Sequence, residues 1–371
     1  MSNQLFWAPR MKGARFNEHT IPLDILKDLA ALESMVLDVA KWHYLEENSD
    51  KQRTPNGFSS AVSLQLSTIE EGSAIPNIYL STTPSLFPGS AESYFFKAKE
   101  TIISVVRAVN QGLPFSHLMP PSFLSGFDKI GRSLKPSESI ELAPSEPQAA
   151  ILDQQVRHKL VLAASKTQKY TENITVRGCI SRLHSDENTF TLQLINGRTI
   201  TGTYQPQHHD DILTALSGFK EVVQTKIKLQ GIGTFNRFQR LQSMVVEHTS
   251  ILPSRDVGAR LDAFRTFKKG WFDGEGEPFE DASLDWLTEA FDNFYLEDLP
   301  LPLVFPLPDG TVRAEWRFND YEASLEIDLR TKQAAWFWFS LSNDHDDEKN
   351  LNLMETSDWA YLNKKIKESM V

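Results

Sequence analysis

The chain has 371 residues, of which 40% are hydrophobic and 23% are charged, and its formal net charge is −11 at pH 7. This composition is typical of globular proteins and excludes a disordered or fibrous chain, while the length predicts two or three domains, of which we take three. The only cysteine, Cys179, excludes an intrachain disulfide and a cysteine zinc cluster, and no apolar run approaches the ~20 residues of a membrane span. We therefore expect a cytoplasmic protein that has no secretory signal and does not enter a membrane.

The first predicted domain, residues 1–150, is a helix-rich α+β domain. Apolar residues at spacings of three and four predict amphipathic helices over 23–45 and 90–112. Between them, apolar and polar residues alternate over 61–69, as on a half-buried strand. The proline-rich stretch 113–147 predicts packed loops with short helical pieces.

The second predicted domain, residues 151–253, is a small β-barrel with a preceding helix. The pair Asn196-Gly197 lies between two alternating segments and predicts a tight hairpin. A short helix, predicted to be capped by Asp210 or Asp211, precedes two further strands. Glycines inside the strands suit a strongly bent sheet that closes on itself, so we expect an OB-like or SH3-like barrel.

The third predicted domain, residues 254–371, is an acidic α+β domain. Its pattern predicts an amphipathic helix over 281–296, and the closely spaced prolines of 300–308 forbid a central strand there. Three alternating segments over 311–342 predict an antiparallel meander. A terminal helix from about Ser357 is predicted to cover one face, and the whole chain is therefore predicted to be α+β.

Charge is divided unevenly among the three predicted domains. The first holds 13 basic and 16 acidic residues, the second 12 and 8, and the third 13 and 25, which gives net charges of −3, +4 and −12. In an OB-like barrel, a cationic groove with aromatic residues binds single-stranded nucleic acid by phosphate neutralisation and base stacking, although solvated arginines over an aromatic core explain the same pattern. The candidate nucleic-acid-binding residues are Arg177, Arg182, Arg198, Lys226, Lys228, Arg237 and Arg240, with Phe235 and Phe238.

The C-terminal domain carries the candidate residues for binding a protein partner. Dense carboxylates attract basic proteins and raise their association rate, although a solvated loop explains them equally well. A single-layered sheet would expose one alternating set of the aromatic strand 336–339, whereas helices on both faces would bury both sets. The candidate set is Trp316, Trp336, Trp338, Asp344, Asp346 and Asp347.

No sequence motif predicts catalysis. The run 208–211 contains two histidines and two aspartates, but four consecutive side chains project in different directions, which disfavours a metal site. Glu322, Glu326 and Asp328 share one strand face at period two, as on an outward polar face, and no lysine follows at close spacing. We therefore expect no catalytic residue, no metal and no cofactor, and we interpret Cys179 as a buried structural thiol.

Three parts of the sequence resemble uncharacterised bacterial proteins: GSAIP at 72–76, INGRTITG at 195–202, and PLPLVFPLPDGTVRAEW with EASLEIDL over 300–329. The last part is similar to a module of small proteins from toxin/antitoxin-like or phage-defence loci. The resemblance implies a non-enzymatic binding protein, antitoxin-like or a defence-complex subunit, that holds a protein partner through its C-terminal domain. The alternatives are a nucleic-acid-binding regulator that acts through the barrel and an unrecognised metal-dependent enzyme.

Overall fold

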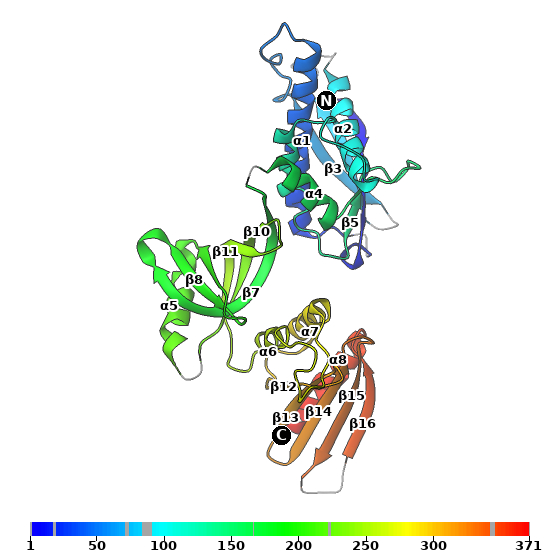
Figure 1. Cartoon of the computed structure of the whole chain (residues 1–371). Helices are drawn as coiled ribbons and strands as arrows, with labels where there is room; N and C mark the ends of the chain where they lie inside the picture. The colour runs from blue at the N-terminus through cyan, green and yellow to red at the C-terminus, as the bar shows by residue number, and fades with distance from the viewer. Residues whose placement is uncertain are drawn as a thin grey trace. The chain divides into compact units, whose positions relative to one another are not determined.

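The fold is known from a computed structural model, and it is α+β as predicted (Figure 1). The chain divides into two compact units, one formed by residues 1–174 with 232–243 and the other by 175–231 with 244–371. The predicted division into three domains stays a prediction. The structure describes residues 2–17, 20–70, 74–83, 91–165, 167–221, 224–341 and 346–370.

Two long helices and a three-stranded antiparallel sheet form the centre of the first unit. Both helices match their predicted spans, because each has one apolar stripe that it buries in the core. The central strand β4 was not predicted, since it is buried on both faces and its sequence does not alternate. The elements are β1 (Ser2–Trp7), α1 (Leu23–Glu47), β3 (Val62–Glu70), β4 (Ile75–Thr82) and α2 (Glu92–Asn110), with the strand order β1-β4-β3.

A second, smaller sheet and two further helices complete the first unit. Helix α4 begins after Asp153, whose carboxylate accepts a hydrogen bond from the Val156 backbone N–H at 2.8 Å. The predicted short helical pieces of 113–147 are confirmed as a four-residue helix and a 3-10 turn. The elements are β2 (Arg10–Lys12), η1 (Ala14–Phe16), α3 (Pro121–Leu124), η2 (Ser125–Asp128), β5 (Ser139–Glu141), β6 (Ile151–Leu152) and α4 (Gln154–Ala164).

Five strands form a closed barrel with the order β10-β11-β9-β8-β7. The predicted sequence of three strands, a helix and two strands is confirmed. Gly202 pairs with Phe190 across two strands, and an added Cβ would overlap the Phe190 ring, so this glycine leaves room for a buried aromatic residue. The elements are β7 (Lys169–His184), η3 (Ser185–Glu187), β8 (Thr189–Leu194), β9 (Thr199–Thr203), η4 (Pro206–His208), α5 (His209–Ser217), η5 (Gly218–Lys220), β10 (Ile227–Asn236) and β11 (Leu241–Ile251).

The predicted cap of the short barrel helix is wrong. His208 occupies the N-cap position of α5 and makes no side-chain capping hydrogen bond. Asp210 and Asp211 lie in the first helical turn instead, where carboxylates interact favourably with the helix dipole. Asp211 is also engaged by a hydrogen bond from the Thr249 hydroxyl at 2.5 Å.

The C-terminal part of the second unit is a five-stranded antiparallel meander with helices on one side (Figure 1). The middle three strands were predicted and the outer two were not. Strand β12 contains Pro306 but lies at the edge of the sheet, where a missing N–H is tolerated, and strand β16 is an acidic run that looks like a loop in sequence. The elements are α6 (Val257–Phe264), α7 (Asp281–Phe294), β12 (Leu303–Pro306), β13 (Val312–Arg317), β14 (Tyr321–Asp328), β15 (Gln333–Ser340), β16 (Asp346–Asn352) and α8 (Thr356–Ser369).

Candidate functional site

The C-terminal sheet has one buried face and one open face. Successive side chains of a strand point to opposite faces, and the inner set packs with helices α6, α7 and α8 in one hydrophobic core. Each of four large apolar side chains on the outer set remains 36% to 45% exposed. They are Leu303 and Phe305 on β12, and Phe337 and Phe339 on β15.

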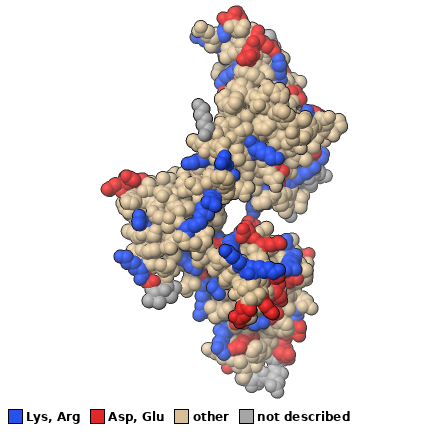
Figure 2. Space-filling view, viewed as in Figure 1, with Lys and Arg blue, Asp and Glu red and all other residues tan. Residues whose placement is uncertain are grey.

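Charged residues fill the outer face between these two apolar pairs. Arg313 contacts Glu326 at 2.5 Å, and Arg317 contacts Glu322 at 2.5 Å, so the middle of the face is largely neutralised by its own ion pairs. In the space-filling view, acidic and basic side chains interleave over the C-terminal part of the chain (Figure 2).

The two phenylalanines of β15 lie directly beside carboxylates of β16. In the strand register, Phe337 pairs with Glu348, and Phe339 pairs with Asp346. Both carboxylates are exposed, and neither pairs with a cation in the part of the chain that the structure describes. This half of the outer face therefore combines exposed aromatic surface with unbalanced negative charge.

The predicted tryptophans lie on the opposite face of the sheet. Trp316 and Trp336 are buried in the core, where the Trp316 indole N–H donates to the Tyr295 hydroxyl at 2.9 Å. Trp338 is half-buried, and its indole N–H donates to the Ser369 hydroxyl of α8 at 2.7 Å. The strand does expose one alternating aromatic pair, but this pair is Phe337 and Phe339, because the helices cover the tryptophan face.

The three predicted acidic residues have different positions. Asp346 is exposed on the outer face, whereas Asp344 lies outside the described residues. Asp347 belongs to the inner set, forms an ion pair with the Lys365 ammonium of α8 at 2.6 Å, and accepts a hydrogen bond from the Tyr361 hydroxyl of the same helix at 3.0 Å. Burial, together with the Asp347 carboxylate, raises the pKa of Tyr361 to about 12.

Two of the predicted nucleic-acid-binding residues are held by aspartates of the second unit. The Arg177 guanidinium lies 3.6 to 3.8 Å from the carboxylates of Asp256, Asp262 and Asp292. Lys228 contacts Asp292 at 2.6 Å. These two cations are therefore already balanced by carboxylates of the same chain.

The β10–β11 turn presents the most exposed of the predicted residues. Phe238 is 65% exposed, and the Arg237 guanidinium lies 4.6 Å from the centre of its ring. The Asn236 side-chain oxygen accepts backbone N–H bonds from Phe238 and Arg240 at 3.0 and 3.1 Å, which fixes the turn. An ordered turn thus carries one exposed aromatic ring between two exposed arginines.

The other predicted residues of the barrel do not join this turn. Phe235 is half-buried and stacks on Tyr170 at 5.5 Å between ring centres, as part of the first core. Arg182 and Arg198 are exposed, and Lys226 lines a cavity of the second unit. The nine residues are divided between the two units, since only those of 232–243 belong to the first.

The histidine-rich run does not form a metal site in the described chain. His209 Nδ1 lies 2.9 Å from the Tyr204 hydroxyl, and His208 is buried. Among the residues that the structure describes, no three His, Cys, Asp or Glu side chains are grouped so that they could hold a metal ion. The Cys179 thiol is buried as predicted, and none of the described helices combines the length and apolarity of a membrane span.

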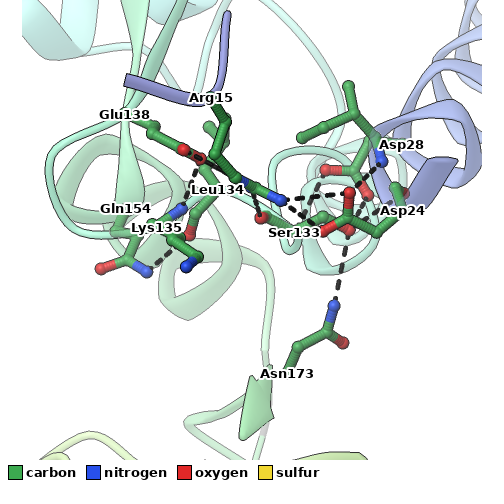
Figure 3. A network of polar contacts seen from close by, with 10 residues as sticks. Arg15, Asp24, Asp28, Ser133, Leu134, Lys135, Glu138, Gln154 and Asn173 are labelled. Atoms are coloured by element: carbon green, nitrogen blue, oxygen red, sulfur yellow. Dashed lines mark hydrogen bonds and ion pairs between the residues drawn. The ribbon is translucent and has the colours of Figure 1, made fainter. Parts of the chain in front are cut away.

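A buried polar network in the first unit was not predicted from the sequence. The Arg15 guanidinium donates to both carboxylate oxygens of Glu138 at 2.7 Å, and also to Asp24 at 2.9 Å (Figure 3). Asp28 accepts hydrogen bonds from the Ser133 backbone N–H at 3.1 Å and from its hydroxyl at 2.9 Å. Burial raises the pKa of Asp28 to about 6. The network ties helix α1 to the segment before β5, which makes it a structural element rather than a second open site.

No protein-family model matches the chain, and no curated protein sequence matches it. Exposed aromatic rings beside charged side chains make the outer face of the C-terminal sheet and the β10–β11 turn the two candidate binding surfaces.

Proposed function

We propose that this chain is a non-enzymatic binding protein that holds a basic protein partner on the outer face of strands β15 and β16. The observation that carries the proposal is the pairing of Phe337 with Glu348 and of Phe339 with Asp346 on an exposed sheet face. Aromatic side chains supply much of the binding energy at protein interfaces, and complementary charge steers the encounter. A partner segment with cations beside apolar side chains would match this surface.

The role that best fits such a surface is neutralisation or scaffolding of the partner. The segment 300–329, which forms β12 to β14 of the same sheet, resembles a module from toxin/antitoxin-like or phage-defence loci. This resemblance supports an antitoxin-like protein or a defence-complex subunit. The proposed partner is a protein, and no catalytic step is assigned to this chain.

The test compares partner capture by variants of the outer face. Tagged full-length chain is expressed in its native host, and proteins that co-purify in stoichiometric amounts are identified by mass spectrometry. We expect a basic partner that is retained by the unmodified chain and lost with the double variant Phe337→Ser/Phe339→Ser. Phe272→Ser is the control for an exposed ring elsewhere in the same unit, because Phe272 is 51% exposed, against 36% and 43% for Phe337 and Phe339, and lies outside the sheet.

Charge is tested separately from apolar contact. The double variant Asp346→Lys/Glu348→Lys is expected to slow association with the same partner and to remove much of its salt dependence. Retention of the partner by both double variants would contradict the assignment of this face. A partner that is itself acidic would contradict the proposed charge complementarity.

We propose as a second candidate that the barrel is OB-like and contacts single-stranded nucleic acid through the β10–β11 turn. The specific observation in its favour is the exposed Phe238 ring with Arg237 stacked on one side and Arg240 nearby in the chain. Stacking of one base on an aromatic side chain contributes ~1 to 3 kcal/mol, which corresponds to about 5- to 150-fold in affinity.

Fluorescence anisotropy with a labelled oligodeoxythymidine tests this second candidate. Phe238→Ala is expected to weaken binding by about 5- to 150-fold. Arg240→Gln should reduce the slope of log affinity against log salt by about 0.7, the contribution of one phosphate contact to a single strand. Phe272→Ala serves as the control for loss of an exposed ring elsewhere. Unchanged affinity and salt slope in both turn variants would contradict the assignment.

A further inference from the structure

The second unit contains a small cavity that neither proposed binding surface uses. Its volume is about 140 Å³, and it lies among residues of β7, β8, the segment before β10, and α6. An engineered apolar cavity of about 150 Å³ in another protein admits benzene, so this space suits a ligand of about that size. Six of the lining residues carry the argument: Arg177, Cys179, Leu194, Ile195, Lys226 and Asp262.

The cavity contains one cation without a carboxylate partner. In the described part of the chain, Lys226 forms no ion pair, whereas Arg177 is balanced by three aspartates. The Arg177 side chain is only 9% exposed, and its Nε–H has no hydrogen-bond acceptor despite its burial. That Nε–H lies 3.8 Å from the Asp256 carboxylate and against Gly258, so Lys226 is the cation left for the carboxylate of a ligand.

The other lining residues favour an anion with one charge and an apolar part. Leu194 and Ile195 supply apolar surface, which favours a ligand with an organic part. Asp262 also lines the cavity, and although Arg177 and Arg265 pair with it, its carboxylate repels a dianion such as phosphate more strongly than a monoanion. A singly charged group needs only the ammonium of Lys226 to balance it.

We propose that this cavity binds a small organic monoanion, whose carboxylate contacts Lys226 and whose apolar part packs against Leu194 and Ile195. This site is independent of the protein and nucleic-acid surfaces proposed above, since it shares no residue with strands β15 and β16 or with the β10–β11 turn.

The single cysteine makes the cavity accessible to experiment. Cys179 lines it and is the only cysteine of the chain, so every thiol alkylation reports on this position. Burial raises the pKa of the Cys179 thiol, and the positive charge of Lys226 opposes this effect, which agrees with a lysine close to the sulfur. Alkylation is expected to be slow because the reactive thiolate is disfavoured.

The experiment compares two alkylating reagents that differ mainly in charge. With iodoacetate and with iodoacetamide, the thiolate sulfur displaces iodide and forms a thioether, but only iodoacetate carries a carboxylate. We expect Lys226→Gln to lower the rate ratio of iodoacetate to iodoacetamide by about fivefold, which corresponds to ~1 kcal/mol for one partly exposed ion pair. A change in thiol pKa affects both reagents alike and cancels in the ratio.

Controls separate the cavity from a general charge effect. Lys220→Gln removes an exposed lysine outside the lining and should leave the ratio unchanged, whereas Lys226→Arg should preserve it. Benzoate should protect Cys179 of the unmodified chain from iodoacetamide, and the neutral benzamide should protect it less. An unchanged ratio in Lys226→Gln would overturn the proposal, as would equal protection by benzoate and benzamide.

Discussion

The buried ion pair between Arg15 and Glu138 gives a quantitative test of what holds the first unit together. Arg15→Met would leave the Glu138 carboxylate, whose side chain is 2% exposed, with the backbone N–H of Lys135 at 2.9 Å. Removing one partner of a buried pair costs about 3 to 5 kcal/mol, because the remaining charge stays in a medium of low polarity. The expected loss of stability in the first unit is therefore at least about 3 kcal/mol.

Substitution of Glu138 should lower the free energy of unfolding by less than substitution of Arg15. This difference makes the prediction specific. In Glu138→Gln, Arg15 remains partly exposed and keeps its hydrogen bonds to Asp24 and to the Ser133 carbonyl, both at 2.9 Å. The Arg15 guanidinium can still donate a hydrogen bond to the side-chain oxygen of the glutamine. We expect a loss of about 1 to 2 kcal/mol, as for one weakened hydrogen bond.

Hydrogen exchange measured by mass spectrometry can localise the effect to peptides of α1 and of residues 129–141. A loss of 3 kcal/mol accelerates exchange by about 140-fold, and a loss of 1 to 2 kcal/mol by about 5- to 27-fold. Arg10→Met is the matched control, because Arg10 is 37% exposed and lies 3.6 Å from Glu141, which keeps its closer ion pair with Lys12 at 3.0 Å. Faster exchange in Glu138→Gln than in Arg15→Met would refute the reasoning, and so would an equally large effect of Arg10→Met.

Two further predictions concern pH and packing. Because burial raises the pKa of Asp28 from 3.8 to about 6, its contribution to stability is fully present below about pH 4 and is lost as the pH rises through 6. A carbon-13 NMR titration of the aspartates should show a midpoint near 6 that disappears in Asp28→Asn, and its absence from the unmodified chain would refute the assignment. Gly202→Ala should destabilise the barrel by about 1 to 3 kcal/mol, because the new methyl group would overlap the Phe190 ring. Gly202→Ala should lower the urea concentration at the midpoint of unfolding, and adding Phe190→Leu to the same chain should restore part of that loss. An unchanged midpoint in Gly202→Ala would contradict the packing argument.

Elements with a regular local pattern could be predicted from the sequence, and the others could not. The apolar spacing of α1 and the alternation of β14 reflect burial on one side only, which a sequence pattern records directly. Strand β4 is buried on both sides, and β16 is an acidic edge strand, so neither has the pattern of a half-buried strand. Their assignment depends on the neighbouring strand, which local sequence does not reveal.

The candidate sites show the same limit. Alternation in β15 predicts that every second aromatic side chain shares a face, but which face is open depends on the placement of α8 and α7. The pairing of Phe337 with Glu348 likewise depends on the register between β15 and β16. Arg15 and Glu138 are separated by 123 residues, so no local spacing could have indicated their contact.

The distribution of ion pairs is the reason that we propose a protein partner ahead of nucleic acid for this chain. The barrel segment has a net charge of +4, but Arg177 and Lys228 are balanced by aspartates outside that segment. The cationic surface that remains for phosphate is therefore smaller than the composition indicates, and binding through the β10–β11 turn would depend mainly on Phe238 and its two neighbouring arginines. On the C-terminal sheet, in contrast, the ion pairs occupy the middle strands and leave Asp346 and Glu348 beside exposed aromatic rings. Unbalanced charge and exposed apolar area coincide there, and a partner that supplies cations beside apolar side chains would satisfy both at once.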